Sequence, residues 1–119
     1  MATESTEFRE LSADERDLIG FLVGGMLPEE LIGRSLANGR VSDMRDGGMG
    51  SILFAGPPGR KMGKVLVEAD YRDVDDVLVS ISVNLDTNGE LFELDFWKVD
   101  FSVLRKYPKH SELVIKRTV

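Results

Sequence analysis

Residues 77–98 read VLVSISVNLDTNGELFELDFWK and decide the fold, because apolar and polar side chains alternate on both sides of Asn88-Gly89. Such alternation is typical of β-strands with one buried face, and Asn-Gly favours a tight hairpin turn. A two-residue turn, or a four-residue loop over residues 86–89, keeps apolar side chains opposite one another. A three-residue loop is disfavoured, because it would set Val83 opposite Glu93. The segment therefore predicts an antiparallel hairpin.

The two faces of this hairpin differ in chemistry. The core face is expected to hold the apolar set, namely Val77, Val79, Ile81, Val83, Leu85, Phe92, Leu94 and Phe96. The other face is expected to hold Ser80, Ser82, Asn84, Glu93, Asp95 and Trp97. A tryptophan among polar side chains is either an interface anchor or a residue covered by another element. Cover by the second expected helix or by residues 101–107 is the favoured interpretation of Trp97.

Helical patterns precede the hairpin. Ser12 and Glu15 have the spacing of a capping box, which predicts a helix that ends near Gly24. Pro28 suits the first position of a second helix, which Asn38-Gly39 would close. Further strands are expected over residues 41–45, 51–55 and 64–71, with an edge strand near 113–115. The sequence thus predicts an α+β fold in which two short N-terminal helices pack on an antiparallel meander of about five strands.

Length and composition restrict the class of protein. A chain of 119 residues suits one domain, here residues 11–119 behind a flexible tail over residues 1–10. Without cysteine there is no disulfide, thiol nucleophile or cysteine-based zinc site. The net charge of −6 disfavours nucleic acid as a partner. The polar first residues do not resemble a signal peptide, and no apolar stretch approaches membrane-spanning length. We therefore expect a cytoplasmic protein without a nucleic-acid or membrane partner.

Asp46-Gly-Gly-Met-Gly-Ser51 is the most conspicuous short motif. Glycine-rich loops can direct backbone amides at phosphate, yet this one lacks the Lys-Ser/Thr ending of a P-loop. A hairpin turn in which one or more glycines have positive φ is the favoured interpretation. A cradle for a small ligand is the alternative.

Four aspartates cluster before the hairpin: Asp70, Asp73, Asp75 and Asp76. Their spacing does not fit a calcium-binding EF-hand loop. A solvated turn is the favoured interpretation, and an acidic docking edge is the first functional one. The only histidine, His110, lies in a basic segment and is not spaced for a catalytic triad. We expect neither enzymatic activity nor a cofactor or metal.

Three strings taken together resemble a small bacterial domain family of unknown function: residues 46–51 (DGGMGS), 79–86 (VSISVNLD) and 89–101 (GELFELDFWKVDF). The resemblance spans roughly residues 10–108 and implies no activity. Small acidic bacterial domains without catalytic motifs are often immunity proteins that neutralise a toxin, which is an argument from class.

The expected function is therefore a protein-binding module, in its most concrete form an immunity protein that docks a basic toxin. The expected partner-binding residues are Asp70, Asp73, Asp75, Asp76, Glu93, Asp95 and Trp97. The alternative is a small-ligand-binding or enzymatic domain that uses the glycine-rich loop over residues 46–51. The sequence leaves the oligomeric state open.

Overall fold

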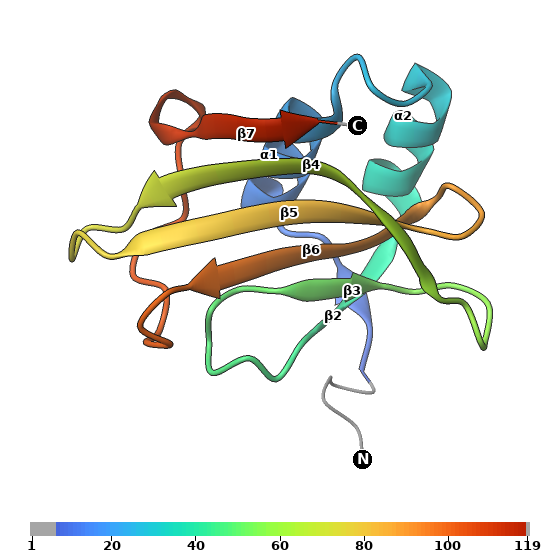
Figure 1. Cartoon of the computed structure of the whole chain (residues 1–119). Helices are drawn as coiled ribbons and strands as arrows, with labels where there is room; N and C mark the ends of the chain where they lie inside the picture. Colours follow the sequence, from blue (N-terminus) through green and yellow to red (C-terminus); the bar gives the residue numbers. More distant parts are fainter. Residues whose placement is uncertain (1–6, 119) are drawn as a thin grey trace.

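A computed structural model describes residues 7–118, in which two helices lie behind a seven-stranded antiparallel sheet (Figure 1). The sheet order is β1-β2-β3-β6-β5-β4-β7. The elements are β1 (Arg9–Glu10), α1 (Ala13–Val23), α2 (Glu29–Asn38), β2 (Arg40–Asp43), β3 (Ile52–Phe54), β4 (Met62–Arg72), β5 (Leu78–Asp86), β6 (Leu91–Lys98), a 3-10 turn (His110–Glu112) and β7 (Val114–Thr118). The expected α+β class, with two helices and an antiparallel sheet, is confirmed.

The expected five-stranded meander is only partly right. Strands β4, β5 and β6 do follow one another as antiparallel neighbours, as do β1, β2 and β3. However, β3 pairs with β6 rather than with β4, and β7 returns to the far side of β4. Local alternation indicates where strands form, but it carries little information about which distant strands pair.

The expected flexible tail is wrong where the structure describes it. Residues 1–6 lie outside the described part of the chain, but Arg9–Glu10 form the edge strand β1. The Arg9 guanidinium lies 2.8 Å from a carboxylate oxygen of Glu15 and 2.7 Å from one of Asp43. These ion pairs tie β1 to the start of α1 and to β2.

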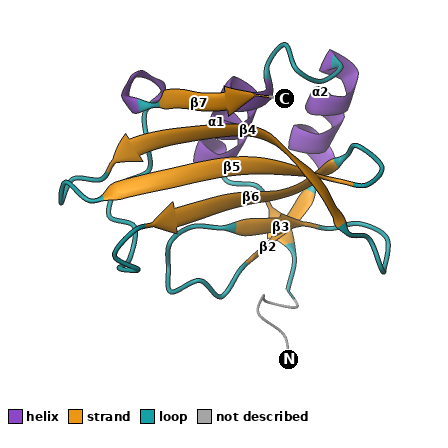
Figure 2. Cartoon of the chain, viewed as in Figure 1, coloured by secondary structure: helices purple, strands orange, loops and turns teal. Residues whose placement is uncertain are grey.

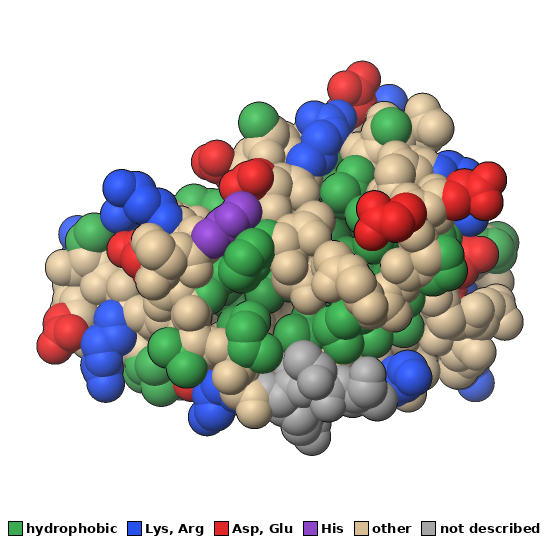
Figure 3. Space-filling model, turned by 90° about the horizontal axis from the view of Figure 1, so that it is seen from above, with side chains coloured by type: hydrophobic (Ala, Val, Ile, Leu, Met, Phe, Trp, Pro, Cys, Tyr) green, Lys and Arg blue, Asp and Glu red, His purple; other side chains and the backbone are tan. Residues whose placement is uncertain are grey.

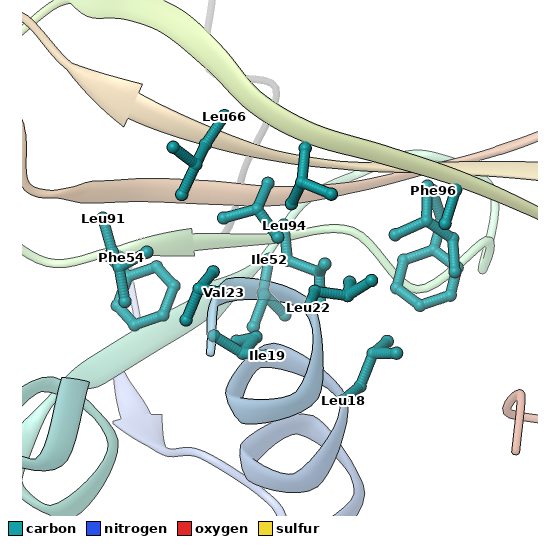
Figure 4. Close-up of a cluster of buried hydrophobic side chains, with 14 of the residues drawn as sticks. Leu18, Ile19, Leu22, Val23, Ile52, Phe54, Leu66, Leu91, Leu94 and Phe96 are labelled. Atoms are coloured by element: carbon teal, nitrogen blue, oxygen red, sulfur yellow. The ribbon is translucent and has the colours of Figure 1, made fainter. Parts of the chain in front are cut away.

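Helix α1 supplies most of the helical side of the core. The Ser12 hydroxyl accepts from the Glu15 amide at 3.1 Å, and the Glu15 carboxylate accepts from the Ser12 amide at 2.8 Å. These two bonds confirm the capping box. One stripe of α1 points into the core facing the sheet (Figure 4). It consists of Leu18, Ile19, Leu22 and Val23, all of them buried. By contrast, α2 buries only Ile32.

The hairpin register is confirmed, although its turn is not the expected one. Ile81 lies opposite Phe96 and Val83 opposite Leu94, as the alternation predicts. Three residues, 87–89, separate Asp86 from Glu90, whose carbonyl accepts from the Asp86 amide at 2.8 Å. Gly89 has a φ of 82°. Such a turn requires a positive φ, which glycine adopts readily.

A bulge in β6 reconciles this three-residue turn with the predicted faces. The register shifts by one residue, so that Leu85 lies opposite Leu91 while Asn84 lies opposite Glu93. Leu91 therefore takes the core position expected for Phe92, which is only half-buried. A bulge adds one residue to one strand and corrects the offset that the turn introduces.

The side of the sheet away from the helices carries the polar positions of β4, β5 and β6. No helix of the described residues covers it, as the view coloured by secondary structure shows (Figure 2). We call this side the open face. No helix among residues 7–118 has the length and apolar character needed to cross a membrane.

Candidate protein-binding surface

The open face gathers carboxylates from two strands. In the ladder Asp95 lies opposite Ser82, which lies opposite Glu68 on β4. One step along, Asp70 lies opposite Ser80. Glu93 lies opposite Asn84, on the same face. Directly opposed residues project to the same side of a sheet, so Glu68, Asp70, Glu93 and Asp95 share the open face.

Glu93 and Asp95 are incompletely compensated charges. Burial raises the pKa of Glu93 and that of Asp95, and the charge of Asp95 adds to the effect at Glu93. The Asn84 amide donates to Glu93 at 2.8 Å, and the Ser51 hydroxyl lies 3.2 Å from Asp95, but these bonds offset only part of the penalty. No cationic side chain in residues 7–116 forms an ion pair with either carboxylate. A cation docked on the open face would supply the missing compensation.

Trp97 is exposed, so the favoured interpretation of a covered tryptophan is wrong. Its side chain is opposite Ser80 on the open face and is 52% exposed. The ring centroid of Phe101, which is 66% exposed, lies 5.7 Å from that of Trp97. Val99 and Val103 are exposed beside them. We call these four residues the aromatic corner.

Phe101 is held in a backbone conformation that L-residues avoid. Its φ is 64°. For a bulky side chain a positive φ is a genuine outlier. A turn holds the residue there, since its amide donates to the Lys98 carbonyl at 2.8 Å. Asp100 accepts from the Ser102 amide and hydroxyl immediately afterwards. Backbone strain that surrounding bonds maintain is concentrated at functional sites.

The glycine-rich loop lies under this corner. The predicted turn with positive φ is confirmed, with φ of 76° at Gly47, 83° at Gly48 and 109° at Gly50. The Asp46 carboxylate accepts from the Met49 amide at 3.0 Å and from the Ser51 amide at 2.9 Å. The loop and residues 101–104 meet at the same end of the sheet (Figure 2), where the Leu104 amide donates to the Gly48 carbonyl at 3.1 Å.

The acidic turn is not the solvated turn that was the favoured interpretation, because Asp73 is part of the folded interior. Asp73 is buried, and its carboxylate accepts from Lys98 Nζ at 2.9 Å and from the Arg105 amide at 2.7 Å. Burial alone would raise the pKa of Asp73, but these hydrogen bonds outweigh it and hold the pKa below its usual value. Asp75 also accepts from Lys98 Nζ, at 2.6 Å.

The model of a domain of unknown function, DUF6984, matches residues 8–108. The chain belongs to the DUF6984 family. The open face and the aromatic corner lie largely within the matched residues, whereas β7 lies beyond them. No curated protein and no solved structure shows significant similarity to the chain. The predicted resemblance to a family of unknown function is thus confirmed.

The DUF6984 domain brings some of the predicted site residues together and separates others. Asp70, Glu93, Asp95 and Trp97 share the open face, where Asp70 also lies 3.4 Å from Lys116 Nζ. The aspartates of the turn do not join them, because Asp73 and Asp75 bind Lys98 and Asp76 is exposed within the turn itself. Two residues were missed. Glu68 alternates in step with Asp70, so its place could have been predicted, whereas nothing local indicates the conformation of Phe101.

The single histidine of the domain lies on another side. His110 stacks on Phe21 of α1, with ring centroids 4.1 Å apart, and Figure 3 shows the histidine between an acidic and a hydrophobic side chain. Its Nε2 atom is 2.8 Å from a carboxylate oxygen of Asp17, a contact that becomes an ion pair when the ring is protonated. In residues 7–118 no group of three His, Asp or Glu side chains is arranged to hold a metal ion.

Proposed function

We propose that this DUF6984 domain is a protein-binding module that docks a basic protein partner on its open face. The observation that carries the proposal is the aromatic corner, where a strained and exposed Phe101 stands beside an exposed Trp97. Trp97 shares its face of β6 with Glu93 and Asp95, and no cationic side chain in residues 7–116 pairs with either carboxylate. The most concrete form of the module is a bacterial, cytoplasmic immunity protein that covers the active site of a toxin and catalyses no reaction itself.

Physical reasons favour this combination of groups as a docking surface. Tryptophan is enriched among the few residues that dominate binding energy, and such residues lie within a polar rim. Carboxylates around the anchor attract a basic partner over long range and repel an acidic one. A surface of this kind binds through shape and charge.

The alternative, in which the loop over residues 46–51 cradles a small ligand, has less support. The amides of Met49 and Ser51 already donate to Asp46, and the carboxylate of Asp46 would repel a phosphate. Backbone amides that are already bonded offer little to an anion.

Differential capture from the cells that naturally make this chain tests the proposal. Immobilised wild-type chain, Trp97→Ala, Phe101→Ala and Phe21→Ala are compared. Phe21 serves as the control because it is also an exposed phenylalanine but lies on α1, away from the open face. We expect a protein retained by wild type and Phe21→Ala that is lost with Trp97→Ala and with Phe101→Ala.

Kinetics on the captured protein then test the electrostatic part. Glu93→Gln combined with Asp95→Asn should slow association several-fold at low salt, and the difference should fade at high salt. If both corner variants retain every protein that the wild type retains, the open face is not the docking surface.

A further inference from the structure

A second feature of the open face is a pocket at the opposite end of β6 from Trp97. It encloses about 470 Å³ between the start of β6, β3 and the loop that precedes β4. Its walls are mostly apolar: Phe8, Met44, Leu53, Pro57, Pro58 and Phe92. Glu93 and Arg60 also line it. Glu93 lies opposite Leu53 in the ladder, so its carboxylate and the Leu53 side chain line the pocket from the same face of the sheet.

The β6 bulge brings two adjacent residues to the wall of this pocket. The register shift between Leu91 and Glu93 removes Phe92 from the core position and lets Phe92 and Glu93 line the same cavity. Arg60 fixes the floor, because its guanidinium donates to the Phe54 carbonyl at 3.0 Å and to the Leu91 carbonyl at 2.7 Å. The same guanidinium lies 5.0 Å from the centroid of the Phe92 ring. Arg60 and the Phe92 wall are thus held in place before any ligand arrives.

The two charged groups of the pocket are not equivalent. Arg60 is neutralised by Asp86, whose carboxylate oxygen lies 3.0 Å from its guanidinium. Glu93 accepts a hydrogen bond from the neutral Asn84 amide, and no cationic side chain in residues 7–116 pairs with it. Burial raises the pKa of Glu93, as expected for a carboxylate short of compensation. The pocket therefore offers apolar walls and one unpaired negative charge.

We propose that this pocket receives an arginine side chain of the protein partner. The aliphatic stem lies on Leu53 and Pro58, and the guanidinium reaches the Glu93 carboxylate beside the exposed Phe8 ring. Guanidinium suits the site better than ammonium, because it is planar, more weakly hydrated and able to stack on an aromatic ring. Glu93 and Trp97 are four residues apart on one strand, roughly 13 Å, so one partner surface spans both sites.

A small probe tests the pocket without the partner. Butylguanidinium reproduces the stem and head of arginine, and butylurea is its neutral counterpart. Nuclear magnetic resonance titration should give saturable shifts at Phe8, Leu53 and Phe92 with butylguanidinium, at millimolar affinity. Butylurea should bind at least about fivefold more weakly, because it cannot pair with a carboxylate.

Variants locate the charge that binds the probe. Glu93→Gln should weaken butylguanidinium binding by about fivefold, whereas Asp95→Asn, a neighbouring carboxylate on the same face, should change it less than about twofold. Phe8→Ala should also weaken binding. Because Phe8 is an exposed wall residue, this second variant tests the pocket without changing Glu93. In the wild type, the pKa of Glu93 should fall when the probe binds.

The inference is overturned if butylguanidinium gives no saturable shifts, if butylurea binds equally well, or if Glu93→Gln binds the probe as the wild type does. The inference rests on the proposed function only for the identity of the partner. Loss of partner capture with Trp97→Ala, together with a failed probe titration, would contradict the arginine pocket and support the docking face. Unchanged partner capture with Trp97→Ala, together with a successful probe titration, would contradict the docking face and support a guanidinium-binding pocket.

Discussion

Asp95 illustrates how the open face departs from what stability alone would select. Its carboxylate lies in the middle of that face, where burial raises its pKa and the charge of Asp46 raises it further. The Ser51 hydroxyl offsets part of the effect. Proteins retain such destabilised groups mainly where function requires them, which is a trade-off between stability and activity.

Asp95→Asn should therefore stabilise the chain at neutral pH. Because the pKa of Asp95 is raised on folding, the folded chain takes up this proton more readily than the unfolded chain. Its favourable contribution is complete below the unfolded pKa, near pH 4, and is lost as pH rises through the folded pKa. Asparagine keeps an acceptor for the Ser51 hydroxyl and removes the charge.

Thermal unfolding of wild type and Asp95→Asn at several pH values checks this expectation. The variant should melt at a higher temperature at pH 7, and the two curves should converge below about pH 4. A variant that is less stable than the wild type at pH 7 would show that the carboxylate is compensated in a way that its surroundings do not account for.

Residue-level patterns in the sequence separate the two faces of a strand, but they do not show what covers each face. Alternation correctly placed Trp97 and Asp95 on one face of the hairpin and Ile81 on the other. It could not decide the exposure of Trp97, because exposure depends on where residues 99–104 run after the strand ends. The positive φ of Phe101 puts that segment beside the tryptophan without covering it.

Lys98 joins three elements at the end of β6. Its ammonium is fully buried and donates to Asp73 and Asp75 of the turn between β4 and β5 and to the Val103 carbonyl, at 3.0 Å. The Val103 contact fixes the segment that carries Phe101. A buried ion pair adds little to stability compared with apolar packing, but losing one partner leaves the other charge uncompensated.

Asp73→Asn should accordingly destabilise the fold by about 1–3 kcal/mol, because Lys98 loses one of its two carboxylate partners and keeps Asp75. Asp76→Asn is the matched control on the same turn. Asp76 is exposed and has a φ of 65°. Asparagine also tolerates that conformation, and surface substitutions of this kind usually change stability by no more than about 0.5 kcal/mol.

Denaturant unfolding of both variants measures this difference directly. Equal stability of Asp73→Asn and Asp76→Asn would mean that the turn is a solvated loop. The aspartates at positions 73, 75 and 76 predict such a loop when their contact with Lys98 is left out.

The elements themselves were predictable to different degrees, for a physical reason. The capping box and the hairpin faces depend on neighbours in the sequence, so local patterns predict them. The β6 bulge, the strand β1 and the Asp73–Lys98 pair depend on contacts that chain separation hides. The pocket follows from the bulge, so the alternation that identifies the hairpin faces could not reveal it.

At the scale of the whole molecule, the two sides of the sheet differ in composition and in cover. The helical side holds the apolar core, with α1 packed against the strands (Figure 4). The open face carries the carboxylates, the pocket and the aromatic corner. A net charge of −6 supports attraction of a basic partner over long range, but it does not locate the contact. The sequence predicted that Glu93, Asp95 and Trp97 share one face of the hairpin. Their role in binding a partner stays a prediction.

Hydrogen exchange of the chain, alone and bound to its captured partner, tests the central claim most directly. Residues 99–104 lie outside the strands and are largely exposed, and their amide hydrogen bonds belong to short turns and loop contacts. They should therefore exchange faster than the central strands in the free chain. The account predicts that the partner slows exchange over residues 99–104 and leaves α1 and α2, residues 13–38, unchanged. Slowed exchange in those helices with no change over residues 99–104 would place the partner on the opposite side and contradict the account.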